Sequence, residues 1–381
     1  MIKKSKLPEV GTSIFAVMSK MANDHQAINL SQGFPEFPVA EELIDLVYRN
    51  MQMGHNQYAP MAGLPALLEA IAHKIAQTHN RKVDAQTEIT ICCGASEAIF
   101  SSVAALIKNG DEVIVLEPAY DSYIPAVKLA GGHVKTVALD TKTFRPDWEL
   151  VRASITEHTR MLIINTPHNP SGAIFNESDI AALKEILHDF PELILLSDEV
   201  YEHIIFDNKT HLSVLKDDFL AKRSIAVFSF GKTFHATGWK IGYAVAPAAI
   251  TAEIRKVHQY NTYTIHTPTQ HALAEYLQDE AHYLALGNMY EAKRDFFRSA
   301  MSASKFNEIP CSGSYYQLFD YSEITDEHDM AFATRLTKEH GVAAIPVSSF
   351  YEQRTDNKLL RFCFAKGEDT LEKAADILCK I

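Results

Sequence analysis

The sequence predicts an α/β protein in which a largely parallel sheet is covered by helices on both faces. Between residues 88 and 247, short apolar runs alternate with helical patterns, and turn residues separate the two. Most of these runs are apolar throughout rather than at every second position. Strands that are buried on both faces lack the polar alternation of a half-exposed strand, so this pattern is typical of a parallel sheet between helical layers.

The N-terminal region is predicted to consist of helices and two loops. A glycine and two prolines make the stretch 28–38 irregular, and a second loop is expected over 56–63. Helices are predicted over 12–22, 41–51 and 64–79.

The alternating region supplies the strands of the predicted sheet. The apolar runs predict strands over 88–92, 112–116, 133–139, 160–165, 192–200, 224–228 and 240–247. The intervening periodic segments predict helices over 94–108, 123–130, 147–155 and 177–188.

After residue 250 the pattern changes, which predicts a second, smaller domain of α+β type. The helical segments expected here are 250–260, 267–297, 329–340 and one that starts with Gly367 to Thr370; the expected strands are 314–319, 342–345 and 358–364. The segment 267–297 is long enough to link two domains. We expect a large domain over 46–285 and a small domain over 1–45 and 286–381.

Composition excludes several classes of protein. The 381 residues carry a formal net charge of −12, which argues against a nucleic-acid or anionic membrane surface. No apolar run reaches about 18 residues and no apolar core follows the basic N-terminus, so we expect neither a membrane span nor a secretory signal. The five cysteines form no CxxC pair, as in a reducing cytosol. The histidines show no ligand spacing, so no metal is expected.

Lys232 is the residue on which the functional prediction depends. It lies in the stretch Ser229-Phe-Gly-Lys-Thr-Phe-His-Ala-Thr-Gly-Trp-Lys240, between two apolar runs, and Ser229, Gly231 and Gly238 are expected to keep the backbone close. A free lysine is charged at pH 7, so a nucleophilic lysine must be desolvated or held as an imine. The local sequence alone favours a surface lysine in a tight loop, so partners elsewhere in the chain must decide.

The ends of the other predicted strands supply partners for this lysine, because ligands of a parallel sheet bind beyond the carboxyl ends of its strands. Gly94-Ala-Ser96 opens a helix whose free N–H groups suit a phosphate, although small residues also make simple turns. Tyr120 could stack on a planar ring or pack against the surface. Asn169 could donate to an oxyanion or serve only its turn.

The strand at 192–200 delivers Asp198 and Tyr201. A carboxylate at the end of a buried strand needs a cation or strong donors unless it caps a helix. Pyridoxal 5′-phosphate needs all the groups that these strand ends supply: an amine, a carboxylate, a phenol, an amide, a phosphate cradle and an aromatic ring. We therefore predict that cofactor.

These motifs resemble the fold-type I, class I/II aminotransferases that depend on pyridoxal phosphate. The matching segments are 165–172 (Asn-Thr-Pro-His-Asn-Pro-Ser-Gly), 197–201, 229–232, 237–242 and 360–365. Segments 28–35, 56–60 and 117–123 make the chain most similar to the branch of bacterial methionine aminotransferases and kynurenine/glutamine transaminases. The resemblance spans essentially the whole chain and implies a mostly parallel seven-stranded sheet between helices plus a small α+β domain.

The resemblance also implies roles for individual residues. Lys232 would be the Schiff-base lysine and proton carrier, Asp198 would pair with the ring nitrogen, and Tyr201 and Asn169 would donate to the ring oxygen. The phosphate would be held by Ala95, Ser96, Ser229 and Lys240, with Tyr120 stacked on the ring and Tyr58 reaching the neighbouring subunit. Substrate would be bound by Arg361, Asn169 and Gly33, and its side chain by Phe15, Tyr58, Ile265 and His266, the last two from the partner.

The implied activity is a cytoplasmic, homodimeric aminotransferase that moves the amino group of methionine, aromatic amino acids, histidine or glutamine to a 2-oxo acid. Its active site would be shared between subunits. A cysteine-conjugate C–S β-lyase on the same scaffold is an open alternative. A non-catalytic regulator that senses the cofactor is a third, but it would need a DNA-binding module, and the acidic balance opposes one.

Overall fold

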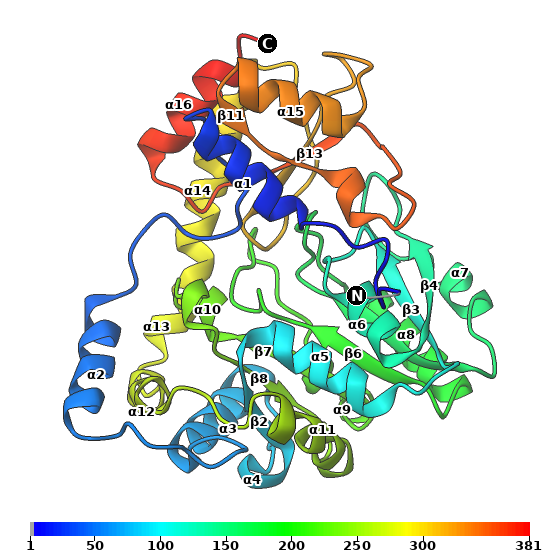
Figure 1. Cartoon of the computed structure of the whole chain (residues 1–381), viewed down its shortest axis with the longest axis vertical. Helices are drawn as coiled ribbons and strands as arrows, with labels where there is room; N and C mark the ends of the chain where they lie inside the picture. The colour runs from blue at the N-terminus through cyan, green and yellow to red at the C-terminus, as the bar shows by residue number, and fades with distance from the viewer. Residues whose placement is uncertain (1–3) are drawn as a thin grey trace.

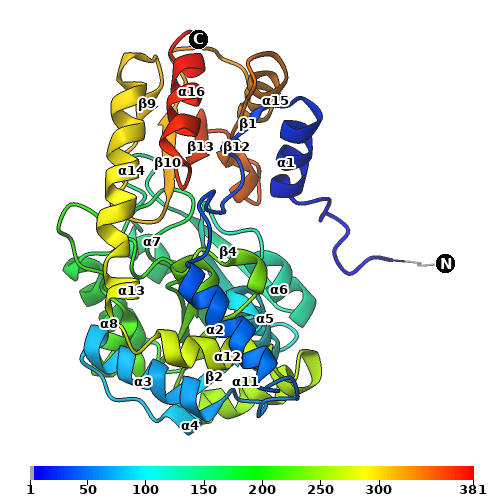
Figure 2. The ribbon, with the colours of Figure 1, turned by 90° about the vertical axis from the view of Figure 1, so that its left-hand side faces the viewer.

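The computed structural model describes residues 4–381; residues 1–3, which we assigned to the small domain, lie outside them. A large sheet with its helices forms the lower part of the molecule, and a smaller group of strands and helices lies above it (Figure 1). The helix α14 (Leu286–Ala300) runs between the two parts (Figure 2). No helix within the described residues is both long and apolar enough to span a membrane.

The large sheet has seven strands, as predicted. Their order across the sheet is β2 (Ile89–Cys92), β8 (Gly242–Val245), β7 (Ser224–Ser229), β6 (Ile194–Asp198), β5 (Thr159–Asn165), β3 (Glu112–Glu117) and β4 (His133–Ala138). All neighbours pair in parallel except β8, which is antiparallel to both β7 and β2. The chain returns from β7 to β8 without a long crossover helix, and only antiparallel neighbours allow that connection. The predicted mostly parallel α/β sheet is confirmed.

Helices cover both faces of this sheet, which explains the uniformly apolar strands. In β3, Val113 and Val115 pack into one core, and Ile114 and Leu116 pack into the other. The first core is closed by α5 (Gly94–Leu106), α6 (Tyr123–Ala130) and α11 (Ala248–Asn261). The second is closed by α3 (Pro65–His79), α7 (Trp148–Ala153) and α8 (Glu177–Asp189).

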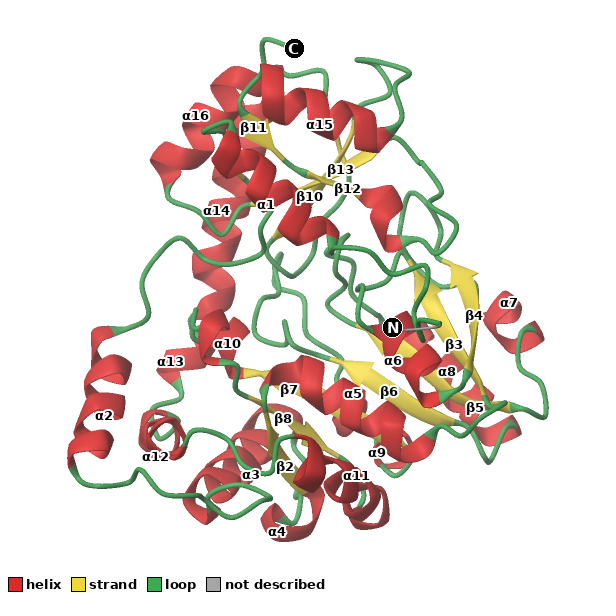
Figure 3. Ribbon diagram, in the orientation of Figure 1, coloured by secondary structure: helices red, strands yellow, loops and turns green. Residues whose placement is uncertain are grey.

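The smaller part combines the C-terminal third with the N-terminal segment. Its antiparallel sheet has the order β12 (Ile345–Pro346), β13 (Leu359–Cys363), β10 (Tyr316–Asp320) and β9 (Asn307–Glu308). A second, parallel pair joins β1 (Ile28–Asn29) to β11 (Val342–Ala343). Around them lie α1 (Ile14–Asp24), α14, α15 (Asp329–Glu339) and α16 (Glu368–Leu378) (Figure 3).

The proposed domain boundary at residues 45 and 46 falls inside α2 (Glu41–Gln52). This helix packs against α12 (Thr267–Tyr276), and Asn50 donates to Glu275 at 2.9 Å. We therefore propose that all of α2 belongs with the large domain. The second proposed boundary, before residue 286, coincides with the start of α14, which packs against α16.

Three predicted elements are wrong in their extent. The predicted helix 267–297 is three helices, α12, α13 (Ala281–Leu284) and α14. Between the first two, the Asp279 side chain accepts the Ala281 N–H at 2.9 Å in place of a helical carbonyl. The predicted strand 342–345 is divided between β11 and β12, which belong to different sheets. The stretch predicted to be irregular contains β1, which pairs with β11.

Short helices complete the fold and were not predicted. They are α4 (Ala85–Glu88), α9 (Asp218–Ala221), α10 (Phe230–Thr233), η1 (Val214–Lys216), η2 (Thr237–Trp239), η3 (Met301–Ala303) and η4 (Val347–Phe350). Single turns of this length give no helical periodicity in a sequence. At α16, the N-cap is Gly367, whose N–H donates to Glu36 at 2.8 Å, so a distant carboxylate caps the helix.

Candidate active site

A cavity of about 350 Å³ lies at the carboxyl ends of the large-sheet strands, where the sequence places the ligand. Residues that follow β2, β3, β5, β6 and β7 line it. Residues of the smaller part close it, among them Gly33 and Tyr316. A Cβ at Gly33 would lie 1.9 Å from the Tyr316 hydroxyl oxygen, so only glycine fits there. The cavity is therefore built from both parts of the molecule.

Lys232 lies on the short helix α10 and lines this cavity. The Ser229 hydroxyl accepts the Lys232 N–H at 3.3 Å and caps the helix. A Cβ at Gly231 would lie 3.1 Å from the Ala236 carbonyl oxygen, so the backbone is close there, as expected. Gly238 has open space around it, which contradicts its expected role. Burial lowers the pKa of the Lys232 amine to about 8. A substantial fraction of this amine is therefore neutral near pH 7 to 8.

Asp198 ends β6 and is almost completely buried in the wall of the cavity. Burial raises the pKa of its carboxyl to about 6. The Tyr123 hydroxyl donates to this carboxyl at 2.5 Å, and this hydrogen bond acts in the opposite direction, to lower the pKa. The Val200 N–H donates to the other oxygen at 3.3 Å. A cation placed beside Asp198 in the cavity would reverse this shift and hold the carboxylate charged.

A candidate anion site lies after β2, at the same edge of the sheet. The helix α5 begins at Gly94, which has φ +71°, and Ala95 and Ser96 in its first turn line the cavity. A Cβ at Gly94 would lie 3.5 Å from the Lys240 Nζ, so the ammonium lies against the start of the helix. An N-terminal helix turn and an ammonium group together favour an anion. Ser229 lines the same cavity.

Arg361 is fully buried on β13, at the smaller part's side of the site. Its guanidinium donates to the Asn169 side-chain oxygen at 2.8 Å and to the Ser31 carbonyl at 2.9 Å, whereas its Nε has no partner among the described residues. The guanidinium carbon lies 3.9 Å from the Tyr316 ring centre and 5.2 Å from that of Phe15. A buried guanidinium with an unused donor suits a carboxylate ligand.

Tyr201 and Asn169 both line the cavity. The Tyr201 hydroxyl donates to the Tyr316 hydroxyl at 3.3 Å, and burial raises the pKa of Tyr201 well above its usual value. The Asn169 N–H donates to the Asn165 side chain at 2.7 Å, and Asn165 in turn donates to the Asp198 carbonyl at 2.8 Å. These contacts fix the segment that follows β5 relative to the end of β6.

The remaining predicted residues fall into two groups. Phe15 and Tyr120 line the cavity, with ring centres 6.4 Å apart. Tyr58, Ile265 and His266 do not line it. Tyr58 is 81% exposed on the surface, and the His266 ring contacts Thr269 at 2.8 Å at the start of α12. The assignment of these three to a neighbouring subunit's site stays a prediction.

Sequence reasoning missed several residues that the structure places at or beside the site, among them Asn165, Tyr123, Tyr315 and Tyr316. Asn165 and Tyr123 stand in segments that carried the family resemblance, so their proximity to Asp198 could have been suspected. Tyr315 and Tyr316 were assigned only to a strand. The pair of adjacent tyrosines in that predicted strand was the available signal that the strand contributes to a site.

A buried polar network lies behind Asp198 and Tyr201. The Glu199 carboxylate is hydrogen-bonded to a His211 ring nitrogen at 2.7 Å, and the Glu202 carboxylate accepts a hydrogen bond from the Lys74 ammonium at 2.7 Å. These glutamates alternate with Asp198 and Tyr201 along the chain but do not line the cavity. The segment that presents Asp198 and Tyr201 is thus anchored from its other side.

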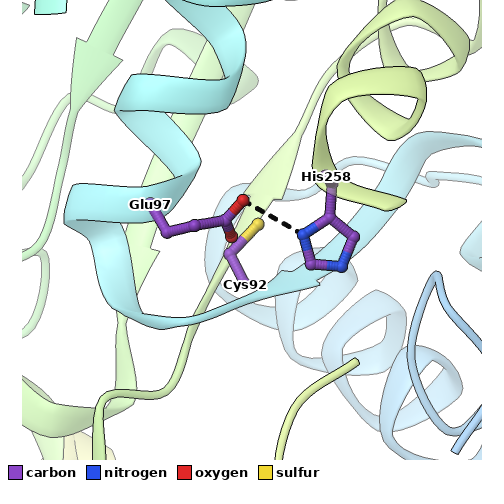
Figure 4. Close-up of side chains that lie close together, drawn as sticks. All are labelled: Cys92, Glu97 and His258. Carbon is purple, nitrogen blue, oxygen red and sulfur yellow. Dashed lines mark hydrogen bonds and ion pairs between the residues drawn. The ribbon is translucent and has the colours of Figure 1, made fainter. Parts of the chain in front are cut away.

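A second buried cluster, Cys92, Glu97 and His258, lies next to the start of α5 (Figure 4). Their potential ligand atoms lie within 4.8 Å of one another. The Cys93 N–H donates to Glu97 at 3.1 Å, and the two ring nitrogens of His258 face Glu97 and the Met61 carbonyl at 3.1 Å each. All these nitrogen and oxygen atoms have protein partners, so the cluster is complete without an ion. It connects α11 with the first turn of α5.

The residues of the cavity fit pyridoxal phosphate. A desolvated amine, a buried carboxylate that forms no ion pair within residues 4–381, and an anion site with an ammonium group line one space. Each corresponds to one part of that cofactor: its aldehyde, its ring nitrogen and its phosphate. The unused Nε of Arg361 leaves a donor for the carboxylate of an amino acid.

Comparisons with known proteins agree with this geometry. The family model "Aminotransferase class I and II" matches residues 25–378. The methionine aminotransferase of Escherichia coli (strain K12) is 50% identical over 379 residues, which cover 99% of this chain and 98% of that protein. The kynurenine–oxoglutarate transaminase of Dictyostelium discoideum is 32% identical, covering 97% of this chain and 94% of that protein.

A solved structure is similar throughout. The crystal structure of YbdL from Escherichia coli, reported to identify a methionine aminotransferase function, superposes with a TM-score of 0.97 at 49% identity and covers 100% of both chains. The family is one that depends on pyridoxal phosphate and acts on amino acids and oxo acids. The chain belongs to the class I and II aminotransferases.

Proposed function

We propose that the protein is a pyridoxal-phosphate-dependent aminotransferase that uses methionine as amino donor and a 2-oxo acid as acceptor. One observation carries the proposal: half-buried Lys232, buried Asp198 and an anion site at α5 line a single cavity beside Arg361. The identity to a methionine aminotransferase supports the choice of donor. Aromatic amino acids, histidine and glutamine are further candidate donors.

The chain's residues would hold the cofactor at both ends. When bound, pyridoxal phosphate supplies an aldehyde that combines with amines and a ring that accepts the electron pair released from the substrate Cα. The first turn of α5, Ser229 and Lys240 would bind the phosphate, and Asp198 would keep the ring nitrogen protonated. Tyr201 and Asn169 would donate to the ring oxygen, and Tyr120 would stack on the ring.

Lys232 has two tasks in this proposal. Its amine holds the cofactor between turnovers, and as a free base it takes the proton from the substrate Cα and returns one to the cofactor carbon. The pKa of about 8 supports this, because a base is most effective when its pKa lies near the working pH.

Arg361 would bind the substrate carboxylate through two parallel hydrogen bonds, helped by Asn169 and the Gly33 backbone. The donor's side chain would then face Phe15, Tyr120 and Phe34, which line the cavity. These rings suit the thioether of methionine, since sulfur packs favourably against aromatic rings.

We further propose a cytoplasmic homodimer with shared active sites. Tyr58, Tyr260 and Tyr263 form an exposed aromatic surface; the first two are 81% and 86% exposed, and the Tyr58 and Tyr263 rings lie 5.6 Å apart. Large exposed apolar groups of this kind mark interaction sites. In the dimer Tyr58 would reach the partner's phosphate, and Ile265 and His266 would border the partner's substrate.

A donor panel with one oxo acid tests the proposal. Methionine plus the oxo acid should give the methionine-derived oxo acid, and Lys232→Ala should reduce this rate by at least about 1,000-fold, because the residue that moves the proton is lost. Release of pyruvate and ammonia from a cysteine thioether, with no oxo acid needed and no transamination of methionine, would make the C–S β-lyase the better description.

A further inference from the structure

Beside the cavity, the free amine of Lys232 has a specific docking partner. Its Nζ donates to the Tyr315 hydroxyl at 2.9 Å, and this hydroxyl donates to the Gly33 carbonyl at 2.8 Å. The Nζ itself lies 3.4 Å from the same carbonyl. A phenol has only one O–H hydrogen, and Tyr315 donates it to the Gly33 carbonyl in a hydrogen bond. The phenol oxygen is therefore left to accept a hydrogen bond from Lys232.

Tyr315 is held rigidly for this contact. It is fully buried, and its ring lies edge-on to Tyr201 with 5.2 Å between ring centres. Its carbonyl accepts the Phe364 N–H at 3.1 Å, and the preceding Ser314 N–H donates to the Ile204 carbonyl at 3.0 Å. Backbone contacts on both sides therefore fix the position of the hydroxyl.

The contact has a direct chemical consequence for a neutral amine. When both amine hydrogens point to the acceptors Tyr315 and Gly33, the lone pair is left for the remaining tetrahedral direction, away from both. A base whose lone pair has a fixed direction loses less entropy when it takes a proton. Tyr316, and not Tyr315, is among the residues that line the cavity, so Tyr315 acts on Lys232 rather than on the substrate.

We propose that Tyr315 is a positioning residue whose hydroxyl, together with the Gly33 carbonyl, docks the amine of Lys232 whenever that amine is free. This inference rests on the proposed aminotransferase function, in which Lys232 must be free while it moves the substrate proton. It also links the large-sheet lysine to the N-terminal segment that carries Gly33.

Tyr315→Phe tests the proposal, and Tyr290→Phe is its matched control. Tyr290 is equally buried and its ring centre lies 5.7 Å from that of Tyr315, but its hydroxyl contacts the His235 ring at 3.1 Å and not Lys232. Both variants lose one buried phenol oxygen, so they share any general effect on stability. Circular dichroism and thermal unfolding establish that each is folded.

The first measurement needs no turnover. The purified enzyme, loaded directly with pyridoxamine phosphate so that Lys232 stays free, is labelled with acetic anhydride across a pH series, and mass spectrometry follows the Lys232 peptide. The labelling midpoint gives the pKa of the Lys232 amine in each protein. Loss of the acceptor destabilises the ammonium form, so Tyr315→Phe should move the midpoint down by about 1 pH unit.

The second measurement is the transamination of methionine. Tyr315→Phe should lower kcat by about 10-fold with KM within about 2-fold, because the base and not the binding site is affected. A deuterium at the methionine Cα should slow the variant more than the wild type. The control Tyr290→Phe should resemble the wild type in midpoint and kcat.

The proposal would be overturned if the wild type and Tyr315→Phe had the same Lys232 labelling midpoint and the same kcat. It would also be overturned if Tyr315→Phe and Tyr290→Phe shifted both quantities equally. A wild-type enzyme that transaminates no amino acid contradicts the proposed function instead. The labelling midpoints then still decide whether Tyr315 docks Lys232.

Discussion

Asp198 is a residue whose charge depends on what occupies the cavity. Its carboxyl is buried and accepts hydrogen bonds from Tyr123 and Val200. Burial raises its pKa from 3.8 to about 6, so in the cofactor-free protein the folded state binds a proton more tightly than the unfolded state. The free energy of unfolding therefore falls as the pH rises from about 4 to about 6 through this group.

Asp198→Asn removes this dependence, because asparagine keeps an acceptor for Tyr123 and does not titrate. Relative to the wild type, the cofactor-free variant should gain about 2 to 3 kcal/mol in free energy of unfolding between pH 4 and pH 6.5. Urea unfolding of both proteins at the two pH values measures the difference. Parallel pH dependences would contradict the account of this carboxyl.

Arg361→Lys should weaken binding of the amino acid without unfolding the protein. Lysine keeps the charge but cannot form two parallel hydrogen bonds with a carboxylate or stack between Tyr316 and Phe15. We expect the KM for methionine to rise by about 10- to 100-fold, the effect of losing one charged hydrogen bond. Steady-state kinetics with methionine measures it, and an unchanged KM would exclude Arg361 as the carboxylate partner.

At the residue scale, the sequence predicted the groups that stand directly after strands. Lys232, Asp198 and Asn169 lie at strand ends of one sheet, so their convergence follows from topology alone. The burial of Arg361 could not be predicted from its own strand, because the rings of Phe15 and Phe350 come from distant segments. The contact of Tyr315 with Gly33 likewise depends on how the two parts of the molecule meet.

At the scale of elements, the pair of Lys74 on α3 and Glu202 after β6 connects a covering helix to the segment that carries Asp198. Both side chains are buried and 2.7 Å apart, and Lys74 also donates to the Tyr243 hydroxyl at 3.2 Å. His203 beside them is neutral at pH 7, because burial lowers its pKa to about 3. His79, whose Nε2 lies 3.4 Å from Glu202, also has its pKa lowered by burial, so Lys74 is the main cation facing Glu202.

Lys74→Met should lower the free energy of unfolding by about 3 to 5 kcal/mol, because it leaves Glu202 charged and buried without its ammonium partner. The double variant Lys74→Met/Glu202→Gln should recover part of this loss. Lys184→Met, which breaks an ion pair with Asp217 at the surface, is the control and should cost less than about 1 kcal/mol. Equal losses from both lysine variants in urea unfolding would contradict the role of the buried pair.

The sequence predicted long periodic elements well and interrupted ones poorly. The strands of the large sheet agree with the apolar runs to within a few residues, because burial on both faces leaves a strong local signal. The breaks that separate α12, α13 and α14 leave no mark in the apolar periodicity of the segment. The division of 342–345 between two sheets depends on its partners β1 and β13, which local sequence does not specify.

At the scale of the whole molecule, the aromatic surface of Tyr58, Tyr260 and Tyr263 carries the proposal of a dimer. Tyr260→Glu places a charge at the most exposed of these rings, on α11. We expect it to shift the protein from dimer to monomer in analytical ultracentrifugation, and to lower activity as the shared sites separate.

Leu150→Glu is the matched control, because Leu150 is a half-exposed leucine on α7, away from α2 and α12 in Figure 1. This variant should sediment as the wild type does. A wild-type protein that sediments as a monomer at assay concentrations, with full activity, would contradict the shared site.

The cavity lies between the two parts of the molecule, and the proposed function requires that Lys232 hold the cofactor there. Borohydride reduction of the purified enzyme, followed by peptide mass spectrometry, locates the lysine that is joined to the cofactor. The account predicts the phosphopyridoxyl group on Lys232 and its loss in Lys232→Ala. The group on Lys240 or on another lysine, with Lys232 unmodified, would contradict it.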